Sequence, residues 1–312
     1  MDIVFFGSSN FAVPSLEALS SSGHRISCVV TQPDKKRGRG LSLGVTAIKE
    51  LAGKLNLKIY QPENINMPEA IKLLKVLCAD LFIVIAYGQI LSPEILTIPK
   101  IFSINLHASI LPKYRGAAPI NWAIIKGERT TGITVIKMTK EMDAGPIILQ
   151  KEIEISNDDT SIILEDKLSH LAAQLLLATL SSIENKNYSL IPQDENNVSF
   201  APKLKKEDGQ IDWSKPAGNI YNLIRGCINW PGGFTYYNGK LLKIYKAKVS
   251  SCGPQFASSN LGEIIDISKE GITIATGKDN LIIEELQIEG KRRMRVEEFI
   301  AGHKILPGEI LG

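Results

Sequence analysis

The sequence predicts a mixed α/β fold, in which a Rossmann-like, mostly parallel sheet domain is followed by a small OB-like β-barrel domain. Apolar runs such as 2–6 and 81–85 have the length of buried strands, and segments with helical spacing of apolar residues separate them. Strands and helices that alternate in this way form parallel sheets with right-handed crossovers. Short strands with glycine turns after residue 233 predict the barrel.

The elements of the first domain follow from these patterns in chain order. Apolar residues at 11, 13, 16 and 19 predict a helix directly after the first strand. A long amphipathic helix over 161–184 closes the domain. The remaining strands are expected at 25–30, 57–60, 81–85, 101–106, 132–138 and 147–155, and the remaining helices at 45–55, 68–78 and 119–126.

The character of the chain changes between residues 187 and 209, where prolines and polar residues replace aliphatic ones, as in an interdomain linker. We therefore predict a catalytic domain over 1–188, a linker over 189–209 and a β-barrel domain over 210–312. A helix is expected at 217–226, and strands are expected at 234–237, 240–249, 262–267, 271–275 and 281–288.

Composition bounds the class of protein. Of the 312 residues, 44% are hydrophobic and 22% are charged, which is typical of an ordinary folded protein, and the formal net charge is +3. The four cysteines lack C-x-x-C spacing, so we expect reduced thiols and no structural zinc. Neither a secretory signal nor an apolar run of ~18 residues is present, so we expect a cytoplasmic protein without a membrane span.

The first strand lacks the glycine pattern of nucleotide-binding folds. A dinucleotide site needs G-x-G-x-x-G after that strand, and only Gly7 stands there. No Walker A pattern occurs in the sequence either. A nicotinamide oxidoreductase is therefore the weakest of the enzyme classes considered.

The stretch 103–119 carries the strongest chemical signal. Asn105 and His107 are two residues apart at the end of an apolar strand, so an extended backbone directs both to one face. Prolines and glycines then force a loop before the next helix. Asp143 follows the end of another strand, and strand ends of an open α/β sheet meet at its ligand crevice.

Asn105, His107 and Asp143 together suit acyl transfer without a covalent enzyme intermediate. A carboxylate fixes the imidazole tautomer, imidazole moves protons, and a carboxamide donates to a developing oxyanion. We expect no nucleophile beside them, because no cysteine lies near them in the sequence. One His and one carboxylate are too few ligands for a metal, so none is expected.

Three basic segments suggest contacts with nucleic acid. Residues 35–39 hold four cations beside two glycines, a composition typical of a solvated loop or of a flexible phosphate-binding loop. Residues 213–262 contain cations and no acidic residue, and a further basic cluster follows the last strand. The candidate phosphate contacts are Lys35, Lys36, Arg37, Arg39, Lys243, Lys246, Lys248, Lys291, Arg292 and Arg293.

Three spaced elements closely resemble the folate-dependent formyltransferases. These are Asn105-x-His107, the loop Ser109-Ile110-Leu111-Pro112 with Arg115-Gly116-x-x-Pro119, and Met142-Asp143-x-Gly145. Ile110 where Leu is usual and Ala108 where Gly is frequent are mild departures. Further matches at 5–7, 31–34, 38–40, 227–233 and 291–294 extend the resemblance over essentially the whole chain.

The resemblance implies the branch of that family that acts in translation initiation. The formyl group of 10-formyltetrahydrofolate would pass to the amino group of initiator methionyl-tRNA, with Asn105, His107 and Asp143 as the catalytic trio and no metal. The basic loop would meet the acceptor stem, the barrel would meet the body of the tRNA, and the enzyme would act as a monomer. The folate would lie against Tyr87, Gly88, Gln89, Ile90, Leu91, Ser109, Ile110, Leu111 and Pro112.

Two alternatives share some of these features. A formyltransferase for a small amine, such as glycinamide ribonucleotide or an amino sugar, would need the trio but would have no use for the basic segments. A non-catalytic RNA-binding protein would need the basic segments but would have no use for the trio.

Overall fold

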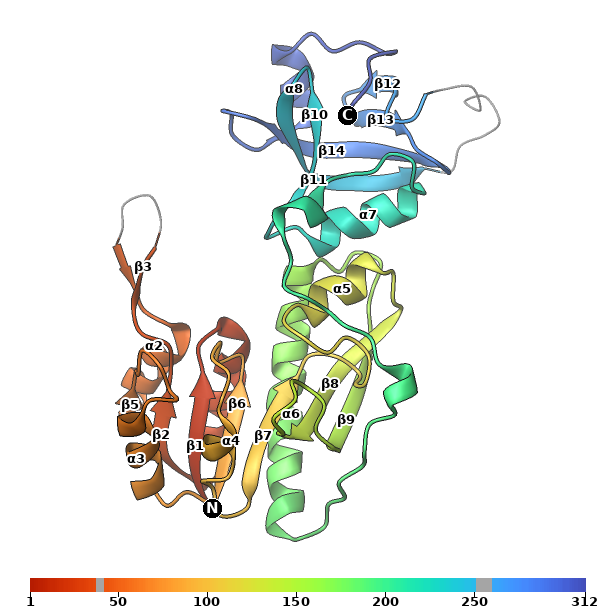
Figure 1. Ribbon diagram of the computed structural model, residues 1–312. Helices are drawn as coiled ribbons and strands as arrows, with labels where there is room; N and C mark the ends of the chain where they lie inside the picture. Colours follow the sequence, from red (N-terminus) through yellow and green to blue (C-terminus); the bar gives the residue numbers. More distant parts are fainter. Residues whose placement is uncertain (38–41, 251–259) are drawn as a thin grey trace. The chain divides into compact units, whose positions relative to one another are not determined.

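The computed structural model describes residues 1–37, 42–250 and 260–312 (Figure 1). This part of the chain forms two compact units. The first unit comprises residues 1–119, 130–154 and 165–201, and the second comprises residues 120–129, 155–164 and 202–312. The second unit thus takes two segments from within the predicted catalytic domain, and residues 189–201 of the predicted linker belong to the first unit.

The first unit contains a seven-stranded sheet in the order β5-β2-β1-β6-β7-β8-β9 (Figure 1). The strands from β5 to β7 pair in parallel, whereas β8 pairs antiparallel with β7 and β9. This mostly parallel sheet confirms the predicted fold class. The strands are β1 (Asp2–Gly7), β2 (Arg25–Val30), β5 (Ile59–Tyr60), β6 (Leu81–Ile85), β7 (Phe102–His107), β8 (Thr130–Lys137) and β9 (Ile147–Glu154).

Apolar side chains of the central strands form the core of this unit. Phe6 of β1 and Phe82 of β6 are fully buried, and their ring centroids are 5.2 Å apart. Each such side chain contributes about 1.5–3 kcal/mol when it leaves water. Because β1 and β6 are covered on both faces, their sequences are uninterrupted apolar runs and do not alternate between apolar and polar residues.

Helices connect the parallel strands. Prolines start α3 and α4, and the hydroxyl of Thr46 caps α2 by accepting from the backbone N–H of Lys49 at 3.1 Å. Among the described residues up to 201, the helices are η1 (Asn10–Ala12), α1 (Val13–Ser20), α2 (Ala47–Lys54), α3 (Pro68–Val76), α4 (Pro93–Leu96), α5 (Pro119–Ile125), α6 (Ser161–Glu184) and η2 (Glu195–Asn197).

A hairpin begins within residues 35–39, where the composition predicted a loop. Strand β3 (Lys35–Arg37) pairs antiparallel with β4 (Ser42–Gly44). At its base, Asp34 binds the ammonium of Lys49 and the amide of Gln61, and the bond from Lys49 lowers the pKa of the Asp34 carboxyl. The hairpin has no alternating apolar pattern, so its pairing could not be predicted from periodicity. Arg39 lies outside the described residues.

The second unit contains an antiparallel sheet in the order β10-β11-β14-β13-β12, with β15 paired to β14 (Figure 1). Helix α7 packs its apolar face on this sheet through Ile220 and Ile224. The sequence predicted α7 and the five longer strands but not α8. The elements are η3 (Lys206–Gly209), α7 (Ala217–Gly226), β10 (Gly233–Tyr237), β11 (Lys240–Ser250), β12 (Ile264–Ser268), β13 (Gly271–Ala275), β14 (Asn280–Ile288), β15 (Met294–Arg295) and α8 (Val296–Gly302).

The last residues of the chain connect the two ends of this sheet. Ile310 bridges to Glu263 beside β12, and the backbone N–H of Gly312 donates to the carbonyl of Tyr236 in β10 at 3.0 Å. The edge strands β12 and β10 are therefore linked through the C-terminal segment, which gives the unit its barrel-like character.

Candidate active site

Strand β7 and the turn after β8 bring the predicted trio together. Asn105 and His107 lie on β7, where they pair with Ile136 and Thr134 of β8. Asp143 lies between β8 and β9 with φ of +52°, a left-handed conformation that places its carboxylate back over the end of β7. Its Oδ2 lies 3.5 Å from Nδ1 of His107, and its Oδ1 accepts from Nδ2 of Asn105 at 3.4 Å.

Two contacts with the loop after β7 fix these groups further. Nε2 of His107 lies 2.9 Å from the carbonyl oxygen of Tyr114. Because a carbonyl only accepts, Nε2 carries a proton, and Nδ1 is the atom that can take up another one beside Asp143. The backbone N–H of Gly116 donates to Oδ2 of Asp143 at 2.9 Å. The His107 and Asp143 side chains are only 6% and 12% exposed, so bulk water screens their interaction weakly.

The loop 109–112 is held by hydrogen bonds beneath it. Buried Thr134 donates its hydroxyl to the carbonyl of Ser109 at 2.6 Å and accepts from the backbone N–H of Leu111 at 3.1 Å. Gln150 donates to the same hydroxyl and to the Leu111 carbonyl. Ser109 is itself buried and donates to the Lys113 carbonyl at 2.7 Å. Its hydroxyl is therefore a structural donor, in keeping with acyl transfer that needs no serine nucleophile.

Residues 87–91, which were predicted to face the folate, differ from one another in burial and in side-chain contacts. Tyr87 and Leu91 are buried in the core cluster around Phe6, whereas Ile90 is 70% exposed. The amide of Gln89 is bound to the backbone of residues 62–65. Gly88 has φ of +87° and leaves its backbone uncovered by a side chain. This segment therefore offers a ligand its backbone and Ile90 rather than its aromatic ring.

Sequence reasoning missed the side chains that support Asp143 from the segment 189–201. The amide of Gln193 donates to the carbonyls of Asp143 and Gly145 at 2.7 and 2.8 Å. Arg115 donates to the Gln193 carbonyl oxygen and pairs with Glu195, and this bond lowers the pKa of the Glu195 carboxyl. The motif that carried the resemblance contains Arg115, but Gln193 stands in a stretch whose polar composition indicated only a linker.

The predicted phosphate contacts of the second unit are partly neutralised. Lys246 and Lys248 both pair with Glu284, at 3.0 and 3.2 Å. Arg292 pairs with Glu298, and Arg293 pairs with Glu285 while stacking over the ring of Tyr245. These acidic residues come from β14 and α8, outside the acid-free stretch 213–262. Lys243 donates to the Pro231 carbonyl at 3.3 Å, and Lys291 is exposed.

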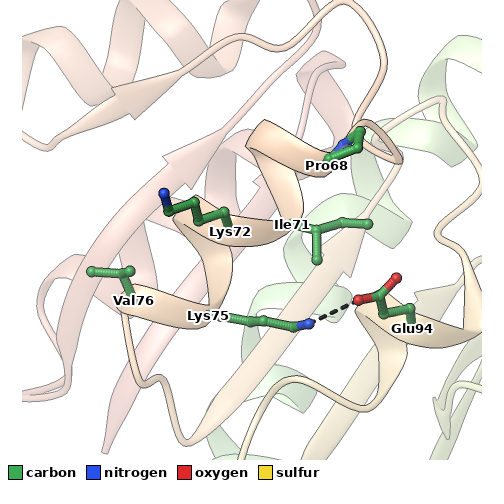
Figure 2. A pocket seen from close by; sticks show the side chains of 6 residues that line it. All are labelled: Pro68, Ile71, Lys72, Lys75, Val76 and Glu94. Atoms are coloured by element: carbon green, nitrogen blue, oxygen red, sulfur yellow. Dashed lines mark hydrogen bonds and ion pairs between the residues drawn. The ribbon is translucent and has the colours of Figure 1, made fainter.

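A shallow surface hollow lies elsewhere on the first unit, over helices α3 and α4 (Figure 2). An ion pair between Lys75 and Glu94, 2.8 Å long, crosses it. The other lining residues are Pro68, Ile71, Lys72 and Val76, so no member of the trio lines this hollow.

The described part of the chain holds neither a cluster of metal ligands nor a helix that could span a membrane. Within residues 1–37, 42–250 and 260–312, no three His, Cys, Asp or Glu side chains gather as metal ligands would. Over the same residues, none of the helices combines the length and the apolar character that crossing a bilayer requires.

Comparison with known proteins identifies what this arrangement resembles. The family described as "Formyl transferase" matches residues 1–180, and "Formyl transferase, C-terminal domain" matches residues 203–304. The methionyl-tRNA formyltransferases of Alkaliphilus oremlandii and Caldanaerobacter subterraneus subsp. tengcongensis are 46% and 47% identical to the chain, and all of this chain and of each relative is covered. Among solved structures, the N-formyltransferase from Helicobacter canadensis in complex with folinic acid and dTDP-3-aminofucose shares the fold, with a TM-score of 0.65 at 21% identity over 90% of this chain and 98% of its own.

Proposed function

The chain belongs to the formyl transferase family, and from this premise we propose that it transfers the formyl group of 10-formyltetrahydrofolate to the amino group of initiator methionyl-tRNA for translation initiation. The observation that carries the proposal is the meeting of Asn105, His107 and Asp143, together with full-length similarity to methionyl-tRNA formyltransferases.

Each member of the trio has one role in this reaction. Nδ1 of His107 takes a proton from the attacking amine, since Nε2 is committed to the Tyr114 carbonyl. Asp143 stabilises the positive charge that this ring then carries. Asn105 donates from its carboxamide to the formyl oxygen as negative charge develops there.

The bonds and protons balance without a covalent enzyme intermediate. The amine nitrogen forms a bond to the formyl carbon, and the bond from that carbon to N10 of the folate breaks. The proton that His107 removes from the amine is returned to N10. Because the Ser109 hydroxyl donates to the Lys113 carbonyl, it is not available in loop 109–112 as a nucleophile that could accept the formyl group.

The two substrates approach different features. We place the folate against the backbone of Gly88, the exposed side chain of Ile90 and the loop of Ser109, Ile110, Leu111 and Pro112. The tRNA acceptor stem contacts the hairpin at Lys35 and its neighbours, and its body contacts Lys243, Lys291 and the paired cations of the second unit. Both tRNA contacts, that of the acceptor stem and that of the body, are electrostatic contacts with phosphates and do not depend on the base sequence.

One copy of the chain suffices for this reaction, because all three catalytic side chains come from the same unit. We therefore propose a monomer that works in the cytoplasm, where initiator tRNA is charged. Light scattering of the purified protein tests the first part: a mass near 34.2 kDa is expected, and a stable dimer would contradict it.

The direct test of the proposed function is formyl transfer with several acceptors. Charged initiator tRNA should be formylated in the presence of 10-formyltetrahydrofolate, whereas glycinamide ribonucleotide and a nucleotide-linked amino sugar should not. Formylation of a small amine in preference to charged tRNA would replace the proposal by the small-amine alternative.

A further inference from the structure

The turn that carries Asp143 is clasped by a side chain from a distant part of the sequence. Gln193 lies 50 residues further along the chain, and its amide nitrogen donates to two carbonyls of the turn, those of Asp143 at 2.7 Å and Gly145 at 2.8 Å. Both N–H groups of the amide are thus used on the turn. The Asp143 backbone has φ of +52°, a conformation that costs about 1 kcal/mol or more for a residue other than glycine unless its surroundings enforce it.

The orientation of this amide is itself determined by its neighbours. On its other side, the carbonyl oxygen of Gln193 accepts from Nε and Nη2 of Arg115 at 3.0 and 2.8 Å. Guanidinium groups only donate and backbone carbonyls only accept, so a flipped amide would face repulsion on both sides. Gln193 therefore links Arg115 to the Asp143 turn in one way only.

Arg115 in turn belongs to the loop that contacts the trio. It is 7% exposed, its backbone pairs with residues 199–201, and Glu195 neutralises it through two further hydrogen bonds. Its neighbours in sequence, Tyr114 and Gly116, contact His107 and Asp143 directly. The same loop thus touches the catalytic pair from one side while its arginine holds Gln193 from the other.

From this geometry we infer that Gln193 and Arg115 are positioning residues, which fix the Asp143 turn so that its carboxylate faces His107 and Asn105. Neither residue touches the reacting atoms, and both act through Asp143. The inference rests on the proposed function, because it concerns the rate of the same formyl transfer. A misplacement of about 1 Å in a catalytic group lowers the rate by up to ~10²-fold.

The variants that test this are Gln193→Met and Arg115→Met, which keep much of the bulk and lose the hydrogen bonds. We expect kcat for charged tRNA to fall about 10-fold or more, while KM for tRNA and Kd for the folate change less than about threefold. Gln210→Met is the matched control, since Gln210 is exposed in the second unit, and it should behave as the parent. Thermal melts report whether each variant is folded.

A double-mutant cycle separates positioning from a general structural role. In the Asp143→Ala background, Gln193→Met should lower the residual kcat less than about twofold, because the residue through which it acts is gone. An equal loss in both backgrounds would overturn the inference, and so would parental kcat in Gln193→Met. Failure of the parent to formylate charged tRNA would instead refute the proposed function, and the cycle would then be read with whichever amine the parent does formylate.

Discussion

Nδ1 of His107 and Oδ2 of Asp143 are 3.5 Å apart, although His107 ends β7, Asp143 lies in the turn between β8 and β9, and 36 positions separate them in the sequence. The carboxylate is also held by the Gly116 N–H, and the imidazole is held by the Tyr114 carbonyl. Each group is therefore fixed from a second side. This relationship is the basis of the first prediction.

Replacing either member of this pair should stop catalysis without unfolding the protein. Asp143→Asn and His107→Ala should each lower kcat for formyl transfer by ~10² or more. Asp143→Asn loses the charge that stabilises the protonated imidazole, and His107→Ala loses the proton acceptor. Steady-state kinetics beside a thermal melt measure both effects. Activity within a few-fold of the parent would remove the residue from the mechanism.

The hydroxyl of Thr134 should matter for stability through the loop 109–112. Thr134→Val leaves the N–H of Leu111 and the carbonyl of Ser109 buried without that partner, at a cost of about 2 kcal/mol or more. We expect Tm to fall by about 4 °C or more. Thr130→Val, at an exposed position of the same strand, is the control and should change Tm little. Equal melts for the two variants would show that the loop does not depend on this hydroxyl.

The ion pairs of Glu284 give a prediction for tRNA binding. Glu284 neutralises Lys246 and Lys248, so Glu284→Gln should free two cations and raise tRNA affinity. The slope of log affinity against log salt concentration should also become steeper, since more counterions are released. Unchanged affinity and slope would indicate that this face of the second unit does not contact phosphates.

Burial should make two of the cysteines unreactive. Burial raises the pKa of the Cys28 thiol to about 11 and that of the Cys227 thiol to about 12, so both remain protonated at pH 8. Cys78 is exposed. Brief alkylation of the native protein at pH 8, followed by peptide mass spectrometry, should label Cys78 well before Cys28 and Cys227. Labelling of Cys227 at the rate of Cys78 would contradict the described packing.

The sequence predicted the sheet and the trio for definite physical reasons. Long apolar strands such as β6 are covered on both faces, so their pattern is unambiguous, and the alternation of side chains on β7 places Asn105 and His107 on one face. The direction of the Tyr87 ring could not be predicted, because an aromatic residue at a strand end does not indicate whether its ring faces the crevice or the core.

The support of Asp143 could not be predicted in the same way. Gln193 contacts a residue that lies 50 positions earlier in the sequence, and its own segment has no periodic apolar residues. Local sequence patterns carry no information about such long-range contacts. The hairpin β3–β4 and the ion pairs of Glu284 were missed for the same reason. Each depends on which segments meet in the folded chain.

The central claim is that the protein formylates charged initiator tRNA and that His107 and Asp143 are catalytic residues of this reaction. The most direct measurement compares initial rates of formyl transfer from 10-formyltetrahydrofolate to initiator methionyl-tRNA for the parent and for Asp143→Asn at equal folded concentration. The account predicts rapid formylation by the parent and a rate at least ~10² lower for the variant. A parent that leaves methionyl-tRNA unmodified, or a variant as fast as the parent, would contradict it.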